Sequence, residues 1–152
     1  MSPMDEERGK PAPRTRAEAE IAVLDSKADP YDQGGGVQLM AVRLRETFSG
    51  DIEGDSTVHA LQALRDDRSA SLVSLQRVRG RLGARQGTFV LQGFEVVEDG
   101  KIRAEWSVVP GSGTGELAGL RGEGGFEGRF GEGSRGVLEY WFEQGPAQRS
   151  GG

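Results

Sequence analysis

The chain has 152 residues, 35% of them hydrophobic and 28% charged, which suits one domain of ordinary size with segments outside its core. Its net charge of −5 disfavours a nucleic-acid partner, because such proteins usually carry a basic surface. It has no cysteine and one histidine, so disulfides and thiolate metal sites are excluded, and we predict neither a metal nor a cofactor. No apolar run approaches the roughly 20 residues of a membrane span. No secretory signal is evident either, so we expect a cytoplasmic protein without a membrane partner.

Between two polar ends, the chain has the pattern of one strand after another. Residues 1–16 and 144–152 mix Pro, Gly and charges of both signs without an apolar period, and we predict disordered tails there. The single predicted domain covers residues 17–143. Within it, eight segments alternate apolar and polar residues and are bounded by turn residues. The predicted strands are 17–25, 37–48, 52–65, 69–79, 87–97, 101–109, 121–130 and 136–143.

The first of these segments is ambiguous, because Ala and Glu in residues 17–25 also favour a helix; its assignment as a strand rests on its place in the pattern. A hairpin turn is predicted at Glu98-Asp99-Gly100, since Asp-Gly suits the positive-φ turns that match strand twist. The other helical candidate is the short segment 116–120. Eight antiparallel strands with short links favour a closed barrel, because closure removes exposed edges, and a sandwich is the competing architecture.

A glycine-rich stretch after the sixth strand contains Gly113-Thr-Gly-Glu-Leu-Ala118, which matches the dinucleotide-binding pattern G-x-G-x-x-A. That function requires a full helix and then a parallel strand. Here further glycines follow almost at once, from Gly119 to Gly125. We therefore interpret the motif as a structural turn.

Four segments go beyond this general pattern: Thr47–Gly54, Ser71–Gly80, Gly87–Gln92 and Trp106–Phe126. In this order they resemble the bacterial family known as domain of unknown function 3224, over residues 17–143. The resemblance implies an eight-stranded antiparallel barrel like that of allene oxide cyclase and the dirigent proteins. Those relatives assemble as oligomers and shape reactive hydrophobic substrates inside the barrel without a cofactor. The family itself carries no established activity.

The chain departs from the family pattern at three polar positions. Family members often have Glu at the position of Gln76, His at that of Gly93 and an acidic residue at that of His59. The first two departures remove the clearest candidates for an acid and a base. We therefore identify no pair of titratable groups that would act as acid and base.

Gln76 is the polar residue that points most directly to a site. It shares a strand face with Leu72, Ser74 and Val78. A buried amide without partners costs about 1–3 kcal/mol, so it must be bonded. Either it bonds neighbouring strands or buried water, or it orients the carbonyl or hydroxyl of a ligand, for which the small Ser74 leaves room.

Aromatic residues offer the same two interpretations. Trp106 and Tyr140 lie on apolar faces, with Phe142 on the face of Tyr140, and such residues either fill a core or line a ligand cavity. Trp141 points the opposite way, which makes it the candidate interface residue of a homo-oligomer, a dimer or trimer. His59 is predicted to point away from the core; a role as general base is the minority interpretation.

Two functions remain open at this stage. The first is a barrel that encloses a small apolar ligand, as a binder or as a cofactor-free cyclase or isomerase that confines one reactive conformer. The second is a non-enzymatic oligomeric barrel that acts through its outer surface around Trp141. A hollow interior with isolated polar groups favours the first, and an interior filled by large aliphatic residues favours the second. The candidate ligand-binding residues are Leu72, Ser74, Gln76, Trp106, Tyr140 and Phe142.

Overall fold

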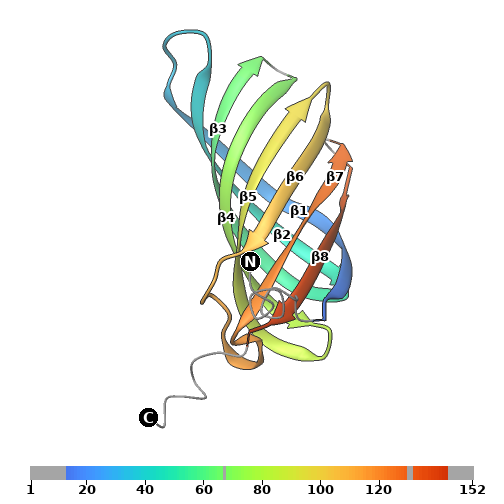
Figure 1. The fold of residues 1–152 in the computed structure, drawn as a ribbon. Coiled ribbons are helices and arrows are strands. Elements are labelled where there is room, and N and C mark those ends of the chain that lie inside the picture. Colours follow the sequence, from blue (N-terminus) through green and yellow to red (C-terminus); the bar gives the residue numbers. More distant parts are fainter. Residues whose placement is uncertain (1–12, 67, 130–131, 144–152) are drawn as a thin grey trace, which may run out of the picture.

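The computed structural model describes residues 13–66, 68–129 and 132–143 and shows a closed barrel of eight antiparallel strands, which confirms the predicted fold class (Figure 1). Each strand pairs with the next, and β8 pairs with β1 to complete the closure. In the described part of the chain, no helix is long and apolar enough to cross a membrane. The elements are β1 (Thr15–Asp32), β2 (Gln38–Gly50), β3 (Ile52–Asp66), β4 (Ser69–Leu82), β5 (Arg85–Glu98), β6 (Lys101–Val108), the 3₁₀ helix η1 (Gly115–Leu117), β7 (Leu120–Arg129) and β8 (Ser134–Phe142).

Alternation along each strand sorts its side chains between the interior and the outer face. On β4, Ser74, Gln76 and Val78 are buried, whereas the alternating Val73 and Leu75 are exposed. The turn between β5 and β6 confirms the predicted hairpin, with positive φ at both Asp99 (52°) and Gly100 (78°).

One end of the barrel, which we call the closed end, is filled by the apolar core. Trp106 belongs to this core, with ring centroids 6.4 Å from Phe48 and 5.4 Å from Phe126. Its indole nitrogen donates a hydrogen bond of 3.1 Å to the carbonyl of Val137. The glycine-rich stretch between β6 and β7 folds as the predicted turn with one short helix, and the fully buried Leu117 of η1 covers this end.

β1 is longer than its sequence indicates. It begins at Thr15 and continues to Asp32, seven residues past the predicted end at Asp25. It pairs with β8 only through Ile21, and beyond that point it pairs with β2 alone. Residues 22–32 are all exposed, and their free edge carries charges and a proline, which discourage pairing with another chain.

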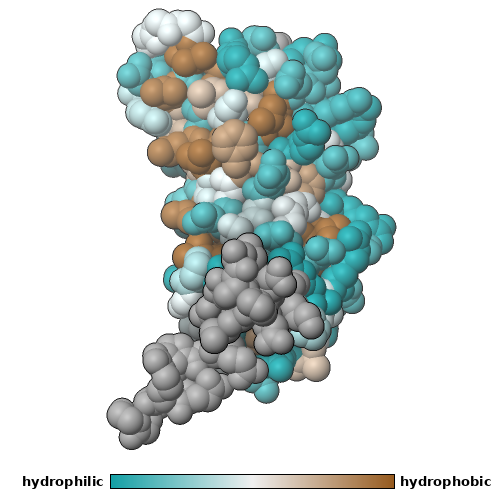
Figure 2. All heavy atoms as spheres, in the orientation of Figure 1, coloured by the Kyte–Doolittle hydropathy of each residue, from teal (hydrophilic) through white to brown (hydrophobic). Residues whose placement is uncertain are grey.

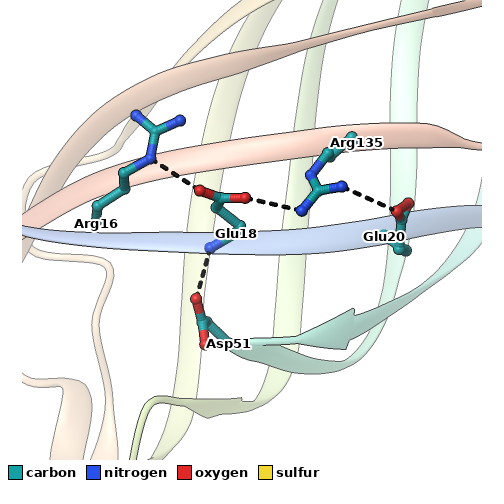
Figure 3. Close-up of polar contacts among 5 residues, drawn as sticks. All are labelled: Arg16, Glu18, Glu20, Asp51 and Arg135. Carbon is teal, nitrogen blue, oxygen red and sulfur yellow. Dashed lines mark hydrogen bonds and ion pairs between the residues drawn. The ribbon is translucent and has the colours of Figure 1, made fainter.

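The seam where β1 meets β8 is held on its outer face by a charged network (Figure 3). Glu18 accepts hydrogen bonds of 3.0 Å from both Arg16 and Arg135, and Arg135 also lies 3.8 Å from Glu20. The backbone amide of Glu18 donates to the carboxylate of Asp51 at 2.9 Å. This network connects three segments that are far apart in the sequence, at the point where the barrel closes.

Candidate functional site

A stripe of polar side chains crosses the inner wall of the barrel above the apolar core. Glu46 on β2 lies opposite Ser56 on β3, and two inward positions of β4 continue the stripe to β5. Each of the five side chains occupies an inward position in the alternation of its strand, so the barrel turns them all toward the interior. We call this set the interior polar stripe: Glu46, Ser56, Ser74, Gln76 and Glu95.

Two short hydrogen bonds connect the strands along the stripe. The Ser56 hydroxyl donates to Oε1 of Gln76 at 2.8 Å, which satisfies the amide oxygen. The Ser74 hydroxyl donates to Oε2 of Glu95, also at 2.8 Å. Within the described residues the amide nitrogen of Gln76 makes no hydrogen bond, so it is a donor available to a ligand or water. The bond from Ser56 agrees with the interpretation that Gln76 bonds a neighbouring strand, and the role of Gln76 toward a ligand stays a prediction.

Glu46 is the most perturbed titratable group of the described residues. Its side chain is buried, with 9% of the residue exposed. Burial raises its pKa to about 7, and the negative charge of Glu95 adds to the rise. A carboxyl group with this pKa exchanges its proton readily at neutral pH, which general acid–base catalysis requires.

Glu95 carries the second carboxyl group of the stripe. Burial raises its pKa, and the hydrogen bond from Ser74 partly opposes the rise. Its other oxygen, Oε1, is buried and has no hydrogen-bond partner within the described residues. A buried oxygen in that state costs about 1–3 kcal/mol, and a ligand hydroxyl or a water that reached it would recover this energy.

Gly93 makes the contact between Ser74 and Glu95 possible. It lies opposite Ser74 on the inner face of β5. A Cβ at this position would come within 2.5 Å of Oε2 of Glu95 and 2.8 Å of the Ser74 hydroxyl. The absence of a side chain at Gly93 therefore leaves space for the carboxylate of Glu95, two residues further along the strand.

Solvent reaches the interior beside Glu46. Val23 lies opposite Glu46 on the inner side of β1, yet 56% of it is exposed, because β1 has left β8 at this point. We call this gap, bounded by residues 22–32 of β1, the β1 opening. On the other side of Glu46, Phe48 belongs to the packed core. The interior polar stripe thus lies at the boundary between a filled half of the barrel and an accessible one.

The structure brings some of the predicted ligand-binding residues together and separates others. Ser74, Gln76 and Trp106 are buried in the interior, and Leu72 is half-buried beside Glu95 on the adjacent strand. Tyr140 and Phe142 instead pack against the core toward the closed end, with their rings 6.1 Å apart. Arg85 of the β4–β5 hairpin covers the Phe142 ring at 4.1 Å. Neither aromatic residue belongs to the interior polar stripe.

Two further residues singled out in the sequence, His59 and Trp141, point outward from the barrel. His59 is exposed on the outer face, as predicted. Trp141 is half-buried beneath the guanidinium of Arg14, which lies 4.3 Å from its ring. In the described ranges, no three His, Cys, Asp or Glu side chains gather in a group able to hold a metal.

The sequence analysis singled out neither Glu46 nor Glu95. A signal was present: Glu46 stands between Leu44 and Phe48 on an otherwise apolar strand face, and Glu95 precedes Val97 in the same way. An acidic residue on the apolar face of a strand is expensive to bury, which makes it a candidate for function.

Comparison with known proteins fits this fold. The family described as "Protein of unknown function (DUF3224)" matches residues 17–143. The chain belongs to this family. It is similar to a crystal structure from Shewanella oneidensis MR-1, a protein with unknown function from the DUF3224 family. The two are 34% identical with a TM-score of 0.72, over 88% of this chain and 100% of the other. A comparison with curated proteins finds no match.

Proposed function

We propose that this DUF3224 protein binds a small, mainly apolar molecule in its barrel and moves a proton on it, as a cofactor-free isomerase or cyclase does. The observation that carries the proposal is the pair of interior carboxyl groups, Glu46 with a pKa of about 7 and Glu95 with a buried oxygen that lacks a partner. Pairs of titratable groups with shifted pKa values are typical of sites for acid–base chemistry.

In the proposed reaction the two carboxyl groups exchange protons with the ligand, and each returns to its starting state. Protonated Glu46 donates its proton to an oxygen of the ligand, while the carboxylate of Glu95 removes a hydrogen from a neighbouring carbon. With a β,γ-unsaturated ketone the product of this step is a dienol, which returns its O–H proton to Glu46 and takes the proton held by Glu95 at the γ-carbon. Both residues are restored and the double bond has moved into conjugation with the carbonyl group, so protons are the only species exchanged.

The neighbouring residues indicate the type of ligand. The amide nitrogen of Gln76 is a donor for a carbonyl or hydroxyl group near the two carboxyl groups. The inward walls around the stripe are apolar, with Leu44 and Leu72 half-buried and Ala60 buried. A ligand with one carbonyl or hydroxyl group on a hydrocarbon frame would match this lining. The predicted likeness to the allene oxide cyclase barrels agrees with such a ligand and with chemistry that needs no cofactor.

The test uses simple ketones, because exchange of a hydrogen next to a carbonyl is the elementary step of the proposed reaction. Cyclohexanone and acetophenone are incubated with the full chain in D₂O, and deuterium uptake is followed by NMR. We expect exchange that depends on pH around neutrality. Glu46→Gln and Glu95→Gln should each slow it by about a hundredfold or more, the usual range for a general acid or base. Glu18→Gln, on the outer seam, is the matched control and should leave the rate unchanged.

A rate in the wild-type protein that Glu46→Gln does not alter would refute the acid–base role. Ligand binding is read separately, from carbon-13 shifts of the Glu46 and Glu95 carboxyl groups as ketone is added. Shifts without exchange would support a binding protein rather than an enzyme. Absence of both would favour the second candidate, a non-enzymatic barrel that acts through its outer surface.

A further inference from the structure

The outer face of β3, β4 and β5 carries large apolar side chains that nothing covers among the described residues. Leu61 is 52% exposed, Val73 51%, Leu75 55% and Phe94 55%. The register places Leu61, Val73 and Phe94 directly side by side on three adjacent strands, with Leu75 next along β4. Figure 2 shows hydrophobic residues gathered on the upper part of this face. We call these four residues the outer apolar patch. Contiguous exposed patches of this kind mark interaction sites.

Charges of opposite sign flank the outer apolar patch on its two sides. On one side lies Arg43 of β2, in the same row as Leu75. On the other lies Glu105 of β6, in the same row as Phe94. Both residues are exposed, and neither forms an ion pair with a described residue. Because β4 is the middle of the five strands, Arg43 and Glu105 stand two strands away from it on opposite sides.

This arrangement is complementary to itself. A two-fold axis that runs along β4, in the plane of the contact, places Arg43 of one copy over β6 of the other, two residues along the strand from Glu105 and within reach of the long arginine side chain. The same operation lays Leu61 of each copy against Phe94 of its partner, with Val73 and Leu75 near the axis. Isologous interfaces require a surface that matches its own image in this way.

A groove beside the patch adds a second geometric feature. It has a volume of about 860 Å³ and crosses the outer face from Val73 on β4 toward β8. Its outward carboxylates are those of Glu105, Glu123 and Glu139, with Arg16 at its far side. Glu123 is already paired with Arg14 at 3.2 Å, so the carboxylates of Glu105 and Glu139 are the ones that could meet a cationic side chain of the partner, such as Arg43.

We propose that the chain forms a two-fold homodimer through the outer apolar patch. The four patch residues themselves point away from the polar stripe, whereas the groove beside them also reaches Ser74 of that stripe. The proposed interface differs from one built on Trp141, whose ring is already covered by Arg14. The contact involves strand faces rather than edges.

The first test is the mass of the full chain by sedimentation velocity over a wide range of concentration. We expect twice the mass of one chain. Val73→Asp and Phe94→Asp should each raise the dimer dissociation constant by about tenfold or more, because central apolar contacts dominate interface energy. Leu24→Asp is the matched control: Leu24 is 53% exposed on β1, away from the patch, and its replacement should leave the dimer intact. Circular dichroism checks that each variant is folded.

Charge exchange tests the two-fold arrangement itself. Arg43→Glu alone and Glu105→Arg alone should each weaken the dimer, and more so at low salt, where the Debye length is long. The double variant Arg43→Glu/Glu105→Arg should restore it, because each new charge then faces its new opposite in the partner. A chain that is monomeric at all concentrations would overturn the proposal. So would a trimer, or a dimer that Val73→Asp and Phe94→Asp do not affect.

Discussion

Glu46 and Glu18 are the same type of residue on the two faces of one barrel wall, and their carboxyl groups behave in opposite ways. Inside, burial and the charge of Glu95 raise the pKa of Glu46 to about 7. Outside, hydrogen bonds from Arg16 and Arg135 lower the pKa of Glu18. The wall is a single layer of backbone, yet it separates an environment that favours the protonated carboxyl group from one that favours the ionised form.

We expect the difference between the inner and outer faces of the wall to be largest for the two tryptophans, Trp106 inside and Trp141 outside. Trp106→Ala removes a ring packed between Phe48 and Phe126, and it leaves the Val137 carbonyl without its donor. We expect a loss of about 3–5 kcal/mol in the free energy of unfolding, as for other large aromatic residues in cores. Urea denaturation followed by circular dichroism measures this loss.

Trp141→Ala is the matched outer variant. It loses half-buried area and the contact with the Arg14 guanidinium, which is worth about 0.5–1 kcal/mol at an exposed site. We expect the urea concentration at the unfolding midpoint to shift far less for Trp141→Ala than for Trp106→Ala. Equal losses from the two substitutions would show that the core around Trp106 contributes less than its packing indicates.

The strands that the sequence predicts well are those whose two faces differ. β3 and β4 bury one face and expose the other, so alternation marks them along their length. The far part of β1 is different, because all of residues 22–32 are exposed. Backbone hydrogen bonds to β2 hold that part in place without burying side chains, and a pattern of hydrophobicity contains no trace of such bonds.

The sequence could predict only the part of the candidate site that lies on a single strand. Ser74 and Gln76 are neighbours on the inner face of β4, so the sequence of that strand already groups them. Glu46 and Glu95 lie on β2 and β5, and their proximity depends on the curvature that closes the barrel. Tyr140 and Phe142 lie on the predicted apolar face, but the position along the barrel axis that puts them near the closed end depends on strand stagger, which alternation does not report.

The pH dependence of stability gives the second test of the comparison. The pKa of Glu46 is about 7 in the folded chain against an ordinary value of 4.5, so the folded state holds a proton that the unfolded state has released. The contribution of Glu46 to the free energy of unfolding therefore falls as pH rises from 4.5 to 7, and it is constant above pH 7. The shift corresponds to about 3 kcal/mol at full ionisation.

Glu46→Gln imitates the protonated carboxyl and should remove this loss. We expect the variant to be more stable than the wild type by up to about 3 kcal/mol near pH 8, and nearly equal to it at pH 4.5. Urea unfolding across this pH range measures both. Parallel stability curves for the two proteins would mean that Glu46 is ionised at the same pH in the folded and unfolded chain, and the acid–base proposal would lose its main support.

Glu18→Gln should have the smallest effect and the opposite sign. A lowered pKa means that Glu18 contributes stability above its ordinary value of 4.5, and that this contribution is lost as pH falls through the folded value. The variant should therefore be slightly less stable than the wild type at neutral pH and equal to it in acid. Added salt should shrink the difference, because the network around Arg135 is exposed to solvent. Glu98→Gln serves as the control, since Glu98 is exposed on β5 without an ion pair to any described residue. A Glu18→Gln effect that resisted salt would show that the seam, like the interior, shields its charges from water.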